Sequence, residues 1–209
     1  MPTLHDSPQA LARIDGQGIG TLLLRNAGSA LNLAKRQGRG GLRFFATEVT
    51  ETPQGPQLRI IGTPCSTLVT ALLTNAALAS LHLDTAAALP PDSKGGLSIE
   101  ALAARPDGSL WIGFRGPLAK GKALLMPLLN PNAVLEGHAP HFGPPTRLDL
   151  DGRGLRDMAW TGSEWILVAG ATGGEQKGTR IFRWSGEGRS PSTLDLPGLK
   201  NLHIEAVAV

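Results

Sequence analysis

The chain has 209 residues, a formal net charge of +3, 41% hydrophobic residues and 18% charged residues. This composition predicts a folded protein with a core, and so mild a net charge does not by itself imply nucleic acid, so no nucleic-acid partner is expected. No stretch approaches the ~18 apolar residues of a membrane span, no hydrophobic signal region is visible, and Cys65 is the only cysteine. We therefore expect a cytoplasmic protein with no membrane partner.

The N-terminal part alternates apolar runs with turn residues. Residues 1–17 are polar and predict a flexible arm, whereas residues 19–25 predict a strand. Residues 26–41 are rich in glycine and basic side chains, which is typical of a loop. Two further strands are expected at residues 42–50 and 57–61, and a turn with two prolines separates them.

The apolar period changes in residues 64–83. Leu68 and Leu72 are four residues apart, and further leucines follow at Leu78 and Leu81. This spacing is that of a helix, so we expect a short helical insertion near residues 64–83. A connector that contains proline then leads back to strands.

A second hairpin is predicted around the turn Arg105-Pro-Asp-Gly108. Proline restricts φ, and Asp-Gly tolerates the positive φ of a tight turn. The flanking residues 98–104 and 109–114 predict the two strands, and 115–120 predict a short loop. Residues 121–129 and 146–150 predict a third and a fourth strand, with a long loop between them.

The same four-strand pattern then repeats. Residues 154–160, 164–169, 179–184 and 193–196 predict four more strands, and LHIEAVAV at 202–209 matches LSIEALAA at 97–104. Four strands in about 40–50 residues is the period of a β-propeller blade. We expect an all-β propeller segment over residues 18–209, made of four-stranded antiparallel blades. Its units are predicted at about 18–63, 96–151 and 153–197, with the first strand of a further blade at 201–209.

The predicted ring is incomplete, because propellers usually contain about 4–8 blades. The chain is then either a segment of a longer propeller or half of an assembly that a second copy completes. The second alternative predicts a homo-oligomer formed through open blade edges.

Acidic residues recur at one predicted position of the repeat. We assign Glu100, Asp157 and Glu205 to the start of the first strand in three successive units. First strands line the channel of a propeller, so these carboxylates are expected to meet at one mouth of the channel. They would bind Ca²⁺, which prefers oxygen ligands, or would accept backbone N–H groups and hold neighbouring blades together. The sequence leaves both alternatives open.

Three further side chains are candidates for ligand binding at this mouth. The second strand of a blade returns antiparallel to the first, which predicts Arg115 beside Glu100 and Thr172 beside Asp157. The planar guanidinium of Arg115 is suited to an anionic group of a ligand. His203 precedes Glu205 by two residues and is expected to share its surroundings.

The runs LSIEALA, PDGSLWIGFRGPL and KALLMPL at residues 97–128 resemble a bacterial family that is defined only as a domain of unknown function. The resemblance covers roughly residues 40–209, and GFRGP at 113–117 is its most specific part. Members of this family look like β-propellers, so the resemblance implies that fold and leaves the activity open. The chain departs from the family pattern at Ala101, where the family has glycine.

The first functional hypothesis is a scaffold that binds a small ligand or a protein partner at the channel mouth. The alternative is a calcium-dependent hydrolase of phosphoesters or lactones, with Glu100, Asp157 and Glu205 as metal ligands. It derives from a looser similarity to calcium-containing propeller lactonases and phytases. No cofactor other than Ca²⁺ is expected.

Overall fold

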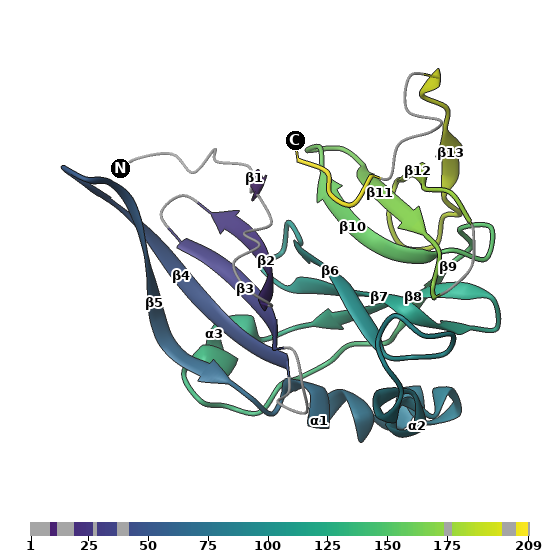
Figure 1. The fold of residues 1–209 in the computed structure, drawn as a ribbon, viewed down its shortest axis with the longest axis horizontal. Coiled ribbons are helices and arrows are strands. Elements are labelled where there is room, and N and C mark those ends of the chain that lie inside the picture. Colours follow the sequence, from purple (N-terminus) through teal and green to yellow (C-terminus); the bar gives the residue numbers. More distant parts are fainter. Residues whose placement is uncertain are drawn as a thin grey trace.

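The computed structural model describes residues 9–11, 19–26, 29–36, 42–173, 177–197 and 204–208. These residues form three antiparallel sheets and a few short helices (Figure 1). Strands that are consecutive in the chain are neighbours in each sheet. Within the described residues the sheets do not close into a barrel or ring. No helix in this part of the chain is long and apolar enough to cross a membrane.

The first sheet has the order β1-β2-β3-β4-β5. Its strands are β1 (Gln9–Leu11), β2 (Ile19–Asn26), β3 (Ser29–Arg36), β4 (Leu42–Thr52) and β5 (Gly55–Cys65). The loop predicted over residues 26–41 is therefore wrong for 29–36, which form β3. This segment pairs with β2 on one side and β4 on the other, and such sheet pairing overrides the weak local preference of the sequence. The predicted arm over 1–17 lies outside the described residues, apart from β1.

The helical insertion follows β5, as the leucine spacing predicted. It consists of α1 (Leu68–Leu73), the 3₁₀ helix η1 (Ala76–Leu81) and α2 (Leu83–Ala88). Leu68, Leu72, Leu78 and Leu83 are buried, which explains why this segment forms helices that pack on the sheets. In Figure 1 the helices lie together at one end of the molecule.

The second sheet has the order β6-β7-β8-β9. Its strands are β6 (Ser98–Ala104), β7 (Leu110–Ala119), β8 (Lys122–Leu128) and β9 (Thr146–Leu148), and α3 (Pro131–Leu135) lies in the long connection before β9. The predicted loop at 115–120 is wrong, because β7 continues to Ala119. Ala119 pairs with Lys122, so the hairpin closes with the two-residue turn between them.

The third sheet repeats this topology with the order β10-β11-β12-β13. Its strands are β10 (Gly154–Trp160), β11 (Trp165–Gly170), β12 (Arg180–Trp184) and β13 (Ser192–Leu194). The strand predicted at 202–209 is absent from residues 204–208, the part of that segment which the structure describes. These residues instead lie beside β10 as an irregular segment (Figure 1).

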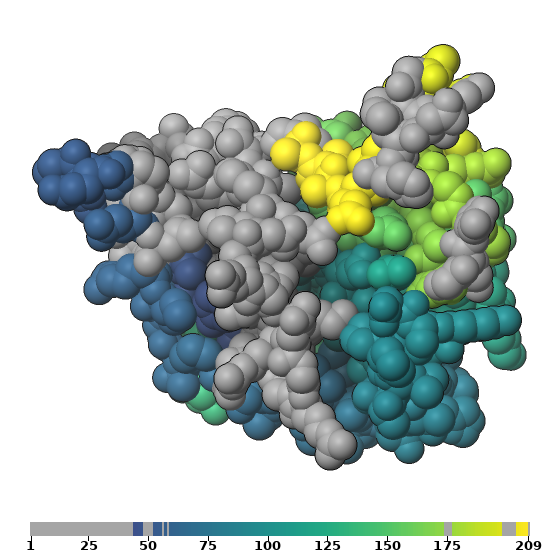
Figure 2. Space-filling model, viewed as in Figure 1, coloured from purple at the N-terminus to yellow at the C-terminus, as the bar shows by residue number. Residues whose placement is uncertain are grey.

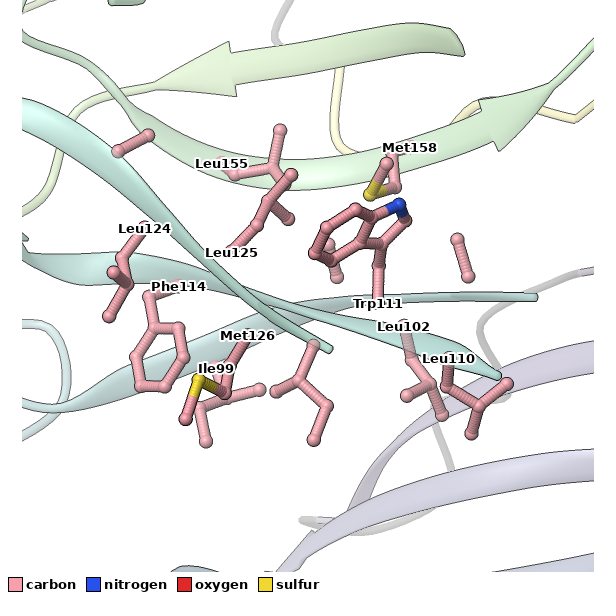
Figure 3. Packing of buried hydrophobic residues seen from close by; sticks show 14 of the residues in the cluster. Ile99, Leu102, Leu110, Trp111, Phe114, Leu124, Leu125, Met126, Leu155 and Met158 are labelled. Atoms are coloured by element: carbon pink, nitrogen blue, oxygen red, sulfur yellow. The ribbon is translucent and has the colours of Figure 1, made fainter. Parts of the chain in front are cut away.

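The second sheet is buried on both faces, and this places it at the centre of the core. Trp111 and Leu125 point toward β10, where they meet Leu155 and Met158 (Figure 3). The rings of Trp111 and Trp184 are 6.0 Å apart, which adds an aromatic contact between the second and third sheets. The two sheets therefore meet through an apolar interface along β6, β7 and β10.

Candidate functional site

The first strands of the second and third sheets share one irregularity. In β6 the pairing with β7 passes from Ile99 to Ala101, so Glu100 is the extra residue of a bulge. In β10 the pairing with β11 passes from Leu155 to Asp157, so Arg156 is the extra residue there. The two strands also have the same burial pattern, with a partly exposed residue at the third position. Arg156 is therefore the structural counterpart of Glu100.

This equivalence corrects the predicted alignment of acidic residues. The sequence predicts Asp157 at the position of Glu100, but Asp157 is the counterpart of Ala101. The assignment was wrong by one residue because it matched acidic side chains. The buried positions Ile99 and Leu102 correspond to Leu155 and Met158, and matching these apolar residues would have identified Arg156.

Glu100 is the centre of the polar contacts at the junction of the two sheets. Its Oε1 accepts a hydrogen bond from Arg115 Nη1 at 2.9 Å and one from Ser98 Oγ at 3.2 Å. Its Oε2 lies 4.0 Å from Arg156 Nη1. The side chain of Glu100 is 27% exposed, and those of Arg115 and Arg156 are 16% and 17% exposed. Two partly buried guanidinium groups therefore share one carboxylate.

Arg115 connects the two sheets. It is an extra residue of β7, since Phe114 pairs with Ile99 and Gly116 pairs with Ser98. Its Nε donates to the carbonyl oxygen of Ala171, directly after β11, at 2.8 Å. The position beside Glu100 agrees with the antiparallel pairing that predicted it. Because Arg115 bonds to Glu100 and Ala171 together, its orientation depends on both sheets being in place.

Arg156 extends the contacts to the C-terminal segment. Its Nη1 lies 3.3 Å from Oε1 of Glu205. Its Nε is buried, and no described residue accepts a hydrogen bond from it. Gly170 of β11 lies against this part of the side chain, where a Cβ would collide with Nε. We call Arg115, Glu100, Arg156 and Glu205 the charged row, in the order of their contacts.

Asp157 anchors the same C-terminal segment through the main chain. Its side chain is 8% exposed and accepts hydrogen bonds from the backbone N–H groups of Met158, at 2.9 Å, and Val207, at 2.8 Å. Burial raises the pKa of Asp157 to about 6, although the two hydrogen bonds act in the opposite direction. A buried carboxylate that accepts a hydrogen bond from the backbone of a distant segment is typical of a structural residue, so we interpret Asp157 as structural.

The remaining predicted site residues are placed as follows. Thr172 is buried next to Ala171, and its carbonyl oxygen is 3.7 Å from the position that a Cβ on Gly116 would occupy. It therefore lies beside β7 and near Arg115. His203 lies outside the described residues.

The three carboxylates that the sequence predicts as calcium ligands have other partners in the structure. Among the described residues, no three His, Cys, Asp or Glu side chains are placed to hold one metal ion. Arg156 contacts both Glu100 and Glu205, so a cationic side chain already lies beside two of the three supposed ligands. Asp157 directs its oxygens to backbone N–H groups instead.

A known protein family matches the part of the chain that contains three of the four residues of the charged row. The family described as "Protein of unknown function (DUF3616)" matches residues 57–203, which include Glu100, Arg115 and Arg156 but not Glu205. No curated protein and no solved structure matches the chain.

Proposed function

The chain belongs to the family described as Protein of unknown function (DUF3616), and we propose that it is a binding scaffold that recognises a carboxylate or phosphate group at the charged row. The observation that carries this proposal is the convergence of Arg115 and Arg156 on Glu100 at the junction of two sheets. The scaffold supplies the rigid sheets, and the two arginines supply hydrogen-bond donors.

The donor capacity of the arginines supports a ligand at this position. A guanidinium has five N–H donors in a fixed plane. Arg115 uses Nε for Ala171 and Nη1 for Glu100, and Arg156 directs Nη1 to both Glu100 and Glu205. The contacts among described residues therefore use part of that capacity, and both side chains reach the surface. Groups that are already held in place lose little entropy on binding, which favours affinity.

We further propose that the sheets are blades of a β-propeller. The support is the repeated strand order of the second and third sheets and the bulge that β6 and β10 share. In a propeller these bulges would face the channel, and the charged row would lie at its mouth. Completion of the ring by a second copy stays a prediction, which native mass spectrometry of the full chain tests.

The binding proposal is tested by thermal unfolding and calorimetric titration of the full chain with citrate and, separately, with inorganic phosphate at constant ionic strength. At 100 times its Kd a ligand adds about 2.7 kcal/mol to the free energy of unfolding. We expect one of the two anions to raise Tm in a saturable manner and to identify the preferred group.

Matched variants locate the site. Arg115→Gln and Arg156→Gln are each expected to weaken the saturable binding, whereas Arg147→Gln, on an exposed position of β9, leaves it unchanged. Binding of neither anion, or equal loss in all three variants, contradicts the proposal. The hydrolase alternative has no support in the geometry, because the acidic residues are paired with arginines and backbone N–H groups.

A further inference from the structure

The C-terminal segment 204–208 lies at the surface beside β10, as the yellow atoms in the middle of Figure 2 show. It brings Glu205 to one end of the charged row, where Oε1 of Glu205 lies 3.3 Å from Nη1 of Arg156. The segment is also held by the N–H of Val207, which donates to Oδ2 of Asp157 at 2.8 Å. The chain itself therefore places a carboxylate on one of the two arginines of the proposed anion site.

The four side chains of the charged row balance one another before any ligand binds. Two guanidinium groups and two carboxylates carry equal and opposite formal charge. An anion added to the intact row would bring a third negative charge beside two guanidinium groups, which disfavours binding. Binding is more favourable when the ligand takes the place of one of the two carboxylates at its arginine.

Glu205 is the carboxylate that a ligand can replace more easily. Glu100 lies within β6, is 27% exposed, and accepts hydrogen bonds from Arg115 and Ser98. Glu205 is 48% exposed and lies on an irregular segment. Moving Glu205 aside therefore leaves the pairing of the strands unchanged. The ligand group then faces Arg156, while Arg115 and Glu100 keep their contact.

We propose, on the basis of the binding function proposed above, that Glu205 is a built-in competitor of the anionic ligand at Arg156 and so regulates the affinity of the charged row. Its carboxylate offers the guanidinium the same chemistry as a carboxylate of a ligand. A ligand binds with full affinity only to the fraction of molecules in which Glu205 has left Arg156. Conditions that draw segment 204–208 away from the third sheet raise this fraction and so tighten binding.

Removing the competitor should tighten binding of the anion. We expect Glu205→Gln to lower the Kd for citrate or inorganic phosphate about two- to fivefold, as for the loss of an exposed ion pair. Calorimetric titration of the full chain at constant ionic strength measures this change. Glu187→Gln is the matched control, because Glu187 is 56% exposed and lies 3.5 Å from the partly buried Arg105, which follows the opposite end of β6. This control should bind the anion as the original protein does.

A double-mutant cycle tests whether Glu205 acts through Arg156. In the Arg156→Gln background the competitor has lost its target, so Glu205→Gln should no longer tighten binding. Tightening that persists in this background would show a general effect of charge and would overturn the proposal. The comparison of Glu205→Gln with Glu187→Gln changes only exposed residues, so it decides the question even if Arg156→Gln folds poorly or binds too weakly to measure.

Competition is reciprocal, so the anion should also loosen the C-terminal segment. The amide of Val207 reports this loosening, because its N–H is bonded to Asp157. We expect a saturating anion to speed hydrogen exchange of this amide about two- to fivefold in the original protein and to have no such effect in Glu205→Gln. Unchanged or slower exchange in the original protein would overturn the proposal.

The titrations distinguish a failure of the competition from a failure of the anion site. If the original protein and Glu205→Gln bind the anion with equal Kd, the competition is wrong and the anion site stands. If neither protein binds citrate or phosphate, both proposals are wrong.

Discussion

Glu100 and Arg156 occupy the same bulge position in β6 and β10, and Oε2 of Glu100 lies 4.0 Å from Nη1 of Arg156. A bulge directs its extra residue away from the regular alternation of the strand. Equivalent bulges in neighbouring sheets therefore bring two side chains of opposite charge to one junction. Arg115 and Glu205 extend the contact on either side, so the charges compensate one another between sheets.

Removing the charge of Glu100 should destabilise the junction. Glu100→Gln keeps the size of the side chain but leaves Arg115 and Arg156 without their shared carboxylate. We expect the free energy of unfolding, measured by urea denaturation, to fall by about 1–2 kcal/mol, between the values for exposed and buried ion pairs. Glu136→Gln is the exposed control and should change it by less than about 0.5 kcal/mol. Equal effects of the two substitutions would show that the junction does not depend on Glu100.

Gly154 allows β10 to approach β7 closely. A Cβ at this position would collide with the backbone carbonyl of Arg115, which cannot move away as a flexible side chain can. We expect Gly154→Ala to lower the free energy of unfolding by about 1–3 kcal/mol through overpacking. Gly178→Ala is the matched control, because no atom lies within 4 Å of its Cβ position. Urea denaturation measures both variants, and an unchanged free energy of unfolding in Gly154→Ala would contradict the close packing of β10 on β7.

Asp157 should make stability depend on pH. Its pKa of about 6 in the folded protein is above the ordinary value of 3.8, so the folded state holds the proton more tightly. The contribution of Asp157 to stability is then present below about pH 4 and is lost as the pH rises through 6. We expect the free energy of unfolding of the Asp157→Asn variant, relative to the original protein, to increase by about 2 kcal/mol between pH 4 and pH 7. Urea denaturation at four pH values measures this difference, and a constant difference would exclude the raised pKa.

Trp111 should be among the largest single contributors to the core. Its indole packs against Trp184 and lies beneath the guanidinium of Arg105, whose Cζ is 4.4 Å from the ring centroid. We expect Trp111→Ala to lower the free energy of unfolding by about 3–5 kcal/mol. Leu129→Ala removes an exposed apolar side chain and should cost less than about 1 kcal/mol. If Trp111→Ala lowered the free energy of unfolding as little as Leu129→Ala does, the result would be inconsistent with the packing of the second sheet on the third.

Local signals predicted most of the strands correctly. The Pro-Asp-Gly turn with apolar runs on either side led to β6 and β7, and the repeat led to β10 with the same bounds as the structure. The leucine spacing led to the helical insertion. The two segments that were wrongly predicted as loops, residues 29–36 and 115–119, have a common explanation. β3 and the second half of β7 form because neighbouring strands pair with them, and such pairing is not encoded in the composition of the segment itself.

The sequence by itself determined the order of strands in the second and third sheets, the helical insertion and the position of Arg115 beside Glu100. These follow from local periodicity, turn residues and the antiparallel return of a hairpin. Matching the buried apolar positions of the two strands would have aligned Arg156 with Glu100, but only the tertiary structure decided that both residues are bulge positions and that they meet at one junction. A bulge is defined by which residues of two strands face each other, so it shifts the register without leaving a mark in one strand's sequence. With Arg156 at the position of Glu100, the junction of the two sheets carries a row of alternating charges.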